Sequence, residues 1–138
     1  MKNLIKFILV ISALQSFYAN AVGIVVVANT DNTDLNIGKR QVRDIFMRSS
    51  SEFALKPVVL KPNSEARLIF NTKVVGLTES RIQSYWAQMQ FGGRKKPPIE
   101  IESPDIMLEY VKNNKNTVTY LPAHIKIPEG LTVIYKVD

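Results

Sequence analysis

The chain has 138 residues, 46% of them hydrophobic and 22% charged, with 18 lysines and arginines against 12 acids. It contains no cysteine and one histidine, which excludes disulfides, thiol nucleophiles, thiolate metal sites and lipid attachment through a cysteine. This length suits one globular domain with a core of its own.

The first 21 residues have the pattern of a secretory signal peptide. Lys2 and Lys6 precede an apolar stretch over 7–14, and residues 19–21 read Ala-Asn-Ala, the small-x-small spacing of a cleavage site. A membrane anchor is the alternative, but the stretch falls short of the roughly 20 apolar residues that span a bilayer. We therefore expect cleavage after residue 21 and a mature domain over 22–138, located in a bacterial periplasm without a lipid anchor.

The first part of the mature chain predicts a strand, a helix and a second strand. Residues 22–28 are rich in β-branched side chains, which is typical of a strand buried on both faces, and we expect it at the centre of the sheet. Asn36 is the expected cap of a helix over about 37–48, whose apolar residues recur at helical spacing. A short strand over 58–60 follows Pro57.

Two helices should come next. One is expected over 64–74, capped by Asn63 or Ser64. The other begins after Thr78, and its apolar positions at i, i+3, i+4 and i+7 predict that Trp86 packs in the core. An aromatic binding platform at Tyr85 and Trp86 is the alternative interpretation.

The last third predicts an exposed loop, a strand, a helix and two more strands. The loop covers 91–98, an alternating edge strand covers 99–102, and Ser103 followed by a proline begins a helix. Short strands are expected over 118–121 and 131–137. This alternation predicts an α/β fold with three layers, a mostly parallel sheet carrying helices on both faces.

The sequence does not carry the motifs of the common enzyme classes. It has no phosphate-cradling glycine loop and no G-x-S-x-G elbow, and His124, the only histidine, is expected in a loop after Pro122. One imidazole without cysteine does not predict a metal site. Removing Lys2 and Lys6 leaves 16 basic side chains against 12 acids, too small an excess to predict a nucleic-acid partner. We expect no enzymatic activity and no cofactor.

One segment could hold a small anion. The helix expected at Ser64 follows a strand, and a helix amino terminus offers free N–H groups and a partial positive charge. Asn63 and Ser64 could contribute polar side chains, and Lys61 and Arg67 could contribute cations. Simple helix capping is the alternative, and Glu65 favours it because a carboxylate in the first turn repels an anion.

Scattered hydrophobic and turn positions also carry a family resemblance. They are Ile45-Phe46, Val58-Val59-Leu60, Ser64, Phe70, Tyr85-Trp86, Phe91-Gly92-Gly93, Pro97-Pro98, the run 107–112 and Thr119-Tyr120-Leu121. Together they resemble the periplasmic phosphate-binding proteins of ABC importers, which have the type II periplasmic binding protein fold. The closer likeness is to the short stand-alone proteins known as phosphate-transporter substrate-binding-like.

In that family two lobes close over the anion, and this chain resembles the single lobe that carries an Arg-x-Asp-Gly-Ser-Gly-Thr loop. The resemblance implies that Ser64 is the serine of this loop, with Lys61 and Arg67 as substitutes for the loop's arginine. The loop's aspartate, two glycines and threonine have no counterpart here, because Pro62, Asn63, Glu65 and Ala66 stand in their places.

Two functions follow as hypotheses. The first is a solute-binding-like protein that holds phosphate or another oxyanion weakly, alone or as a homodimer that places two lobes face to face. The second is an interaction module that has lost its ligand and docks onto an envelope protein, for which Arg94, Lys95 and Lys96 in the exposed loop are the candidate surface.

Overall fold

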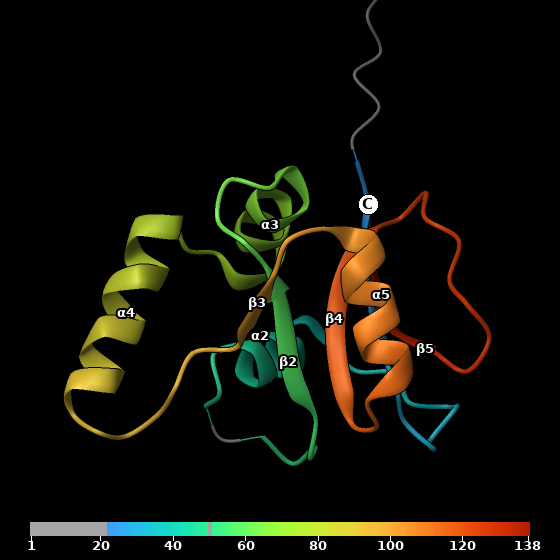
Figure 1. Cartoon of the computed structure of the whole chain (residues 1–138), viewed down its shortest axis with the longest axis horizontal. Coiled ribbons are helices and arrows are strands. Elements are labelled where there is room, and N and C mark those ends of the chain that lie inside the picture. The colour runs from blue at the N-terminus through green and yellow to red at the C-terminus, as the bar shows by residue number, and fades with distance from the viewer. Residues whose placement is uncertain (1–21, 50) are drawn as a thin grey trace, which may run out of the picture.

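The computed structural model describes residues 22–49 and 51–138, so the signal peptide predicted over residues 1–21 lies outside the described part. Within that part no helix is long and apolar enough to cross a membrane. The elements, in chain order, are β1 (Ile24–Ala28), α2 (Lys39–Phe46), β2 (Lys56–Leu60), α3 (Glu65–Phe70), the π-helix η1 (Asn71–Val75), α4 (Glu79–Phe91), β3 (Ile99–Ile101), α5 (Pro104–Asn113), β4 (Thr117–Pro122) and β5 (Thr132–Val137) (Figure 1).

In the described part of the chain, five strands form one sheet in the order β3-β2-β4-β1-β5. β2 is parallel to β3 and β4, whereas β1 is antiparallel to β4 and β5, so four strands point one way and β1 alone is reversed. The predicted mostly parallel sheet is therefore confirmed. The predicted central place of β1 is wrong: all five of its residues are buried, but β4 is the middle strand.

The first helix begins later than the sequence predicted. Asn36 does not cap it, because the backbone N–H of Ile37 donates to the carbonyl of Ile134 on β5 at 2.9 Å and holds this segment against the sheet. α2 begins at Lys39, after the cap residue Gly38, and the side chain of Gln41 accepts from the Gly38 N–H at 2.7 Å.

Successive residues of β4 show the three layers. Tyr120 packs against Phe46 of α2 and Phe70 of α3, with ring centroids 5.8 and 4.1 Å away. Thr119 points to the opposite face, where its hydroxyl contacts the sulfur of Met107 on α5 at 2.8 Å. Because neighbouring residues of a strand face opposite sides, α2 and α3 cover one face of the sheet and α5 covers the other. Figure 1 shows this arrangement, with α5 beside β4 and α2 behind β2.

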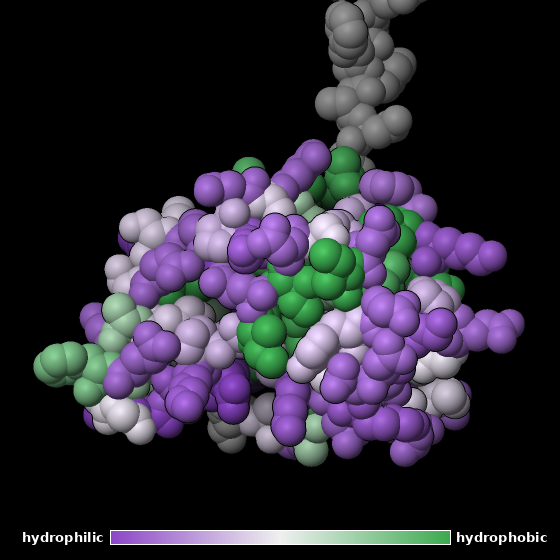
Figure 2. Space-filling model, in the orientation of Figure 1, coloured by the Kyte–Doolittle hydropathy of each residue, from purple (hydrophilic) through white to green (hydrophobic). Residues whose placement is uncertain are grey.

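The face of the molecule shown in Figure 2 is mostly hydrophilic, with a hydrophobic patch over β3 and α5. Ile99 on β3 and Ile106 on α5 are both 55% exposed. β3 is an edge strand, as predicted, and is only three residues long, which limits the length of unpaired backbone that it offers.

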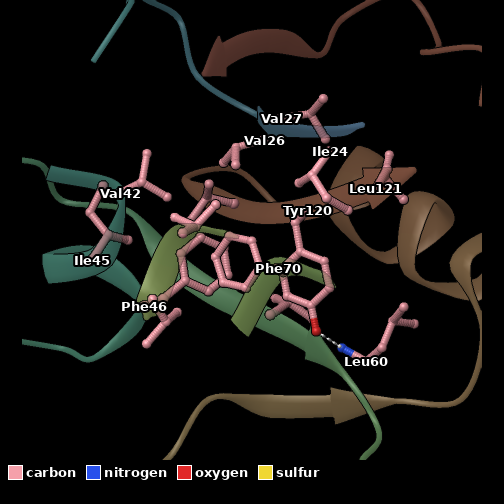
Figure 3. Packing of buried hydrophobic residues seen from close by; sticks show 14 of the residues in the cluster. Ile24, Val26, Val27, Val42, Ile45, Phe46, Leu60, Phe70, Tyr120 and Leu121 are labelled. Atoms are coloured by element: carbon pink, nitrogen blue, oxygen red, sulfur yellow. Dashed lines mark hydrogen bonds between the residues drawn. The ribbon is translucent and has the colours of Figure 1, made fainter. Parts of the chain in front are cut away.

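The core centres on the stacked rings of Phe70 and Tyr120, with Phe46 tilted against both (Figure 3). The buried hydroxyl of Tyr120 accepts a hydrogen bond from the N–H of Leu60 at 3.1 Å, which ties the core to the end of β2. Burial raises the pKa of this phenol well above its ordinary value. It therefore stays neutral and serves as a structural hydrogen-bonding group.

Candidate functional site

The predicted binding residues lie where the parallel strands end. The carboxyl ends of β2, β3 and β4 meet at one edge of the sheet, the upper edge in Figure 1, and α3 and α5 begin there. Ser64 caps α3, and its hydroxyl accepts from the N–H of Arg67 at 3.3 Å. Ser103 caps α5 in the same way, accepting from Ile106 at 3.4 Å. In open α/β sheets, ligands bind in crevices at this edge.

A hollow of about 270 Å³ lies at this edge, lined in part by Ser64, Glu65, Pro104, Pro122 and His124. Its remaining lining residues are apolar, and none of its lining residues is a lysine or arginine. The polar residues of this mostly apolar hollow are thus Ser64, His124 and the acid Glu65. Such a lining gives an anion little electrostatic stabilisation.

Asn63 and Lys61 form the turn between β2 and α3. Asn63 is exposed and has a positive φ of 74°, a conformation that asparagine tolerates in tight turns. The ammonium group of Lys61 forms an ion pair with Glu102, and both side chains are more than half exposed. The hydrogen bond and charge of each partner raise the pKa of Lys61 and lower that of Glu102, so both stay ionised at neutral pH.

Arg67 is held on the other side of α3, away from the hollow at Ser64. Its side chain is 7% exposed, and its guanidinium donates two hydrogen bonds, of 2.9 and 2.6 Å, to the carboxylate of Glu79. A third donor group, Nη1, reaches the carbonyl of Leu60 at 2.6 Å and the carboxylate of Glu100 at 2.5 Å. Arg67 therefore ties α3 to the start of α4 and to β3.

Glu79 is the main partner in this network. It also accepts from the side-chain amides of Asn71 at 2.8 Å and Gln83 at 2.7 Å. Burial alone would raise the pKa of Glu79 and lower that of Arg67, but their hydrogen bonds and opposite charges reverse both shifts. The pKa of Glu79 is lowered and that of Arg67 is raised, so the pair is ionised across the neutral range.

The guanidinium of Arg67 borders a second cavity of about 160 Å³, between α4 and the sheet. Phe46, Phe70, Trp86 and Tyr120 also line this cavity. Trp86 is buried, as its helical spacing predicted, so Tyr85 and Trp86 do not form an exposed aromatic platform. The hydroxyl of Tyr85 instead donates to the carbonyl of Met47 at 3.0 Å and fastens α4 to the end of α2.

The predicted site residues are therefore only partly brought together. Ser64, Asn63 and Lys61 share the turn at the carboxyl edge, whereas the guanidinium of Arg67 lies in a different cavity. Sequence reasoning missed the acids that engage the cations, Glu79, Glu100 and Glu102. Glu100 and Glu102 occupy alternate positions of a predicted edge strand, a pattern that indicates exposure but not a partner 33 or 41 residues away.

Arg94, Lys95 and Lys96, predicted as a partner surface, follow α4 in a loop at a different part of the molecule, where they line a hollow of about 550 Å³. Across residues 22–49 and 51–138, no cluster of three His, Asp or Glu side chains could hold a metal ion.

No family model and no curated protein matches the sequence. Solved structures do match the fold. An ABC-type phosphate transport receptor from Vibrio cholerae matches with a TM-score of 0.61 and 16% identity. A second match, with a TM-score of 0.57 and 13% identity, is a putative phosphate ABC transporter substrate-binding protein with bound phosphate from Clostridium perfringens. Each match covers 82% of this chain but only 45% and 44% of the two larger chains. The chain thus has an α/β fold similar to about half of each structure, in keeping with the single lobe predicted from the sequence.

Proposed function

We propose that this chain is an exported, solute-binding-like protein of one lobe, which holds phosphate or a related oxyanion weakly at the Ser64 turn. The observation that carries the proposal is the position of Ser64. Its hydroxyl caps a helix at the carboxyl edge of the parallel strands and borders a hollow there. The phosphate-binding proteins of similar fold support an oxyanion as the ligand.

Weak affinity follows from the charges around this turn. Glu102 pairs with Lys61, and Glu79 and Glu100 occupy Arg67, so the predicted cations are already compensated. Glu65 adds an exposed carboxylate in the first turn of α3. One lobe also leaves the anion open to water and salt, which weakens charge-assisted hydrogen bonds. We expect a dissociation constant in the millimolar range, about −4 kcal/mol.

Calorimetric titration of residues 22–138 with phosphate and with sulfate at low salt tests the proposal. Ser64→Ala should weaken binding, while Glu65→Gln should strengthen it about two- to fivefold by removing a charge near the helix dipole. Glu102→Gln should also strengthen it, because Lys61 loses its partner.

Thr78→Ala is the matched control, since Thr78 caps α4 with the same 3.3 Å hydrogen bond but lies outside the hollow. It should cost similar helix stability and leave phosphate binding unchanged. A dissociation constant below about 1 μM would contradict the weak site. Absence of binding at tens of millimolar would instead favour the ligand-free interaction module.

A further inference from the structure

The loop after α4 combines one exposed aromatic side chain with a cluster of unpaired cations. Phe91, the last residue of α4, is 97% exposed. Arg94, Lys95 and Lys96 follow it and line a hollow together with Arg48. Within residues 22–49 and 51–138 none of these four cations forms an ion pair. In Figure 2 a hydrophobic group projects at this end of α4, beside hydrophilic side chains.

No acid on this segment compensates the positive charge. Residues 80–99 contain no aspartate or glutamate, and their four cations are Arg81, Arg94, Lys95 and Lys96. The two acids that flank the segment, Glu79 and Glu100, both pair with Arg67 and so do not reach the loop cations. The tip of α4, made of Phe91, Arg94, Lys95 and Lys96, therefore carries a local positive charge that no ion pair within residues 22–49 and 51–138 neutralises.

The loop is held in place by its own backbone. The N–H of Gly93 donates to Gln90 and that of Arg94 to Met89, both at 3.0 Å, so the chain folds back on the end of α4. Gly93 has a φ of 63°, which this turn requires. Pro98 is buried and fixes the far end of the loop. Phe91 and the cations are thus presented as one preformed tip.

We infer that this tip is a docking site for an anionic phospholipid surface. Lysines and arginines bind such a surface electrostatically, and an aromatic ring next to them enters the headgroup region. An acidic protein partner fits less well, because the core of a protein interface contains several apolar side chains. Phe91 is the only exposed large hydrophobic residue from 80 to 98, and the next one, Ile99, belongs to β3 beyond the buried Pro98. This inference does not depend on the oxyanion site.

The test is cosedimentation of residues 22–138, which contain every element described above, with vesicles at low salt. We expect binding to vesicles of phosphatidylglycerol and phosphatidylethanolamine, loss of binding as salt rises, and no binding to phosphatidylcholine vesicles. Combined Arg94→Glu, Lys95→Glu and Lys96→Glu should lower the partition coefficient at least about 100-fold, since each cation contributes roughly fivefold. Phe91→Ser should lower it about tenfold.

Two matched controls separate the tip from general charge and hydrophobicity. The charge control is one variant that reverses three exposed cations on α5, the 123–131 turn and β5: Lys112→Glu, Lys126→Glu and Lys136→Glu. The apolar control is Leu68→Ser, which removes a side chain that is 63% exposed on α3. Neither control should reduce binding more than about fivefold.

A fluorescence measurement on the Phe91→Trp variant tests insertion of the tip. The emission of the added indole should shift to shorter wavelengths with anionic vesicles, while the emission of the buried Trp86 stays constant.

The inference is overturned if the parent domain does not sediment with anionic vesicles, or if the controls lose as much binding as the tip variants. Binding to polyglutamate that needs the three loop cations but not Phe91, without binding to vesicles, would also overturn it and would point to an acidic protein partner.

Discussion

Arg67 shows at the scale of one residue how a cation can be buried when acids and a carbonyl surround it. Three groups surround its guanidinium: the carbonyl of Leu60 and the carboxylates of Glu79 and Glu100. Paired charges of this kind are costly to separate, because the remaining partner is left without compensation in a poorly solvated place. Removing one partner should therefore destabilise the fold, and the intact network fixes the relative positions of α3, α4 and β3.

Replacing Glu79 tests this role. Glu79→Gln should lower the free energy of unfolding by about 1–3 kcal/mol at pH 7, because charge-assisted hydrogen bonds to a buried guanidinium are lost. Urea unfolding followed by circular dichroism measures the change. Glu109→Gln is the control: Glu109 is exposed on α5 with Asn113 as its hydrogen-bonding partner, and its replacement should change stability by less than about 0.5 kcal/mol. Equal midpoints for the parent and Glu79→Gln would contradict the role.

The same variant predicts a pH dependence. The pKa of Glu79 is lower in the folded state than its ordinary value of 4.5, so the folded state binds fewer protons there than the unfolded state. Its contribution is therefore fully present above pH 4.5 and is lost as the pH falls through the folded pKa. The stability difference between the parent and Glu79→Gln should be constant from pH 6 to 8 and shrink below pH 4.5. A difference that grows in acid would contradict the assignment.

At the scale of elements, α4 is the least embedded helix. Ile82 and Trp86 are its buried residues, and Tyr85 and Glu79 attach it through the hydrogen bonds to Met47 and Arg67. The 160 Å³ cavity lies between this helix and the sheet, so α4 depends on few contacts. Segments with few buried contacts open at lower free energy than the core.

Trp86→Ala should lower the free energy of unfolding by about 3–5 kcal/mol, the range for removing a large buried aromatic side chain. Phe91→Ala, on the same helix, is the matched control: Phe91 is almost fully exposed, so its removal should leave stability nearly unchanged. Chemical denaturation of both variants measures the contrast. Similar midpoints for Trp86→Ala and Phe91→Ala would show that α4 does not pack through its tryptophan.

At the scale of the whole molecule, the predicted cleavage point falls just ahead of the fold. β1 begins at Ile24, and the carbonyl of Gly23 accepts from the N–H of Ala123 at 2.9 Å. A side chain at Gly23 would meet the carbonyl of Val137 at 3.0 Å, so this glycine is needed for close packing against β5. Removal of residues 1–21 would leave every described element in place.

Expression in a Gram-negative host should therefore yield a periplasmic protein whose intact mass corresponds to residues 22–138. Ala21→Arg should block cleavage, because the peptidase accepts small residues at this position, and should retain the longer chain in the membrane fraction. Recovery of a chain that retains Met1 from the parent would contradict export by this route.

Much of the fold could be predicted from the sequence because its signals are local. The apolar spacing around Trp86, the caps Ser64, Thr78 and Ser103, and the alternation over 99–102 each report on a few neighbouring residues. Strand periodicity, helix periodicity and capping depend on backbone geometry over one or two turns. The order of helices and strands, the fold class and the burial of Trp86 therefore followed from the sequence.

The tertiary structure alone decided which distant segments meet. In the folded sheet β1 runs opposite to the other strands and β4 lies at the centre. The side chain of Arg67 points away from the hollow at Ser64 and pairs with Glu79 and Glu100, which are 12 and 33 residues away in the sequence. Local patterns state that a side chain is buried or exposed but not which partner it finds, because charge pairing depends on distances that exist only after the chain has folded. The same cation and serine, close in sequence, thus lie in two different cavities.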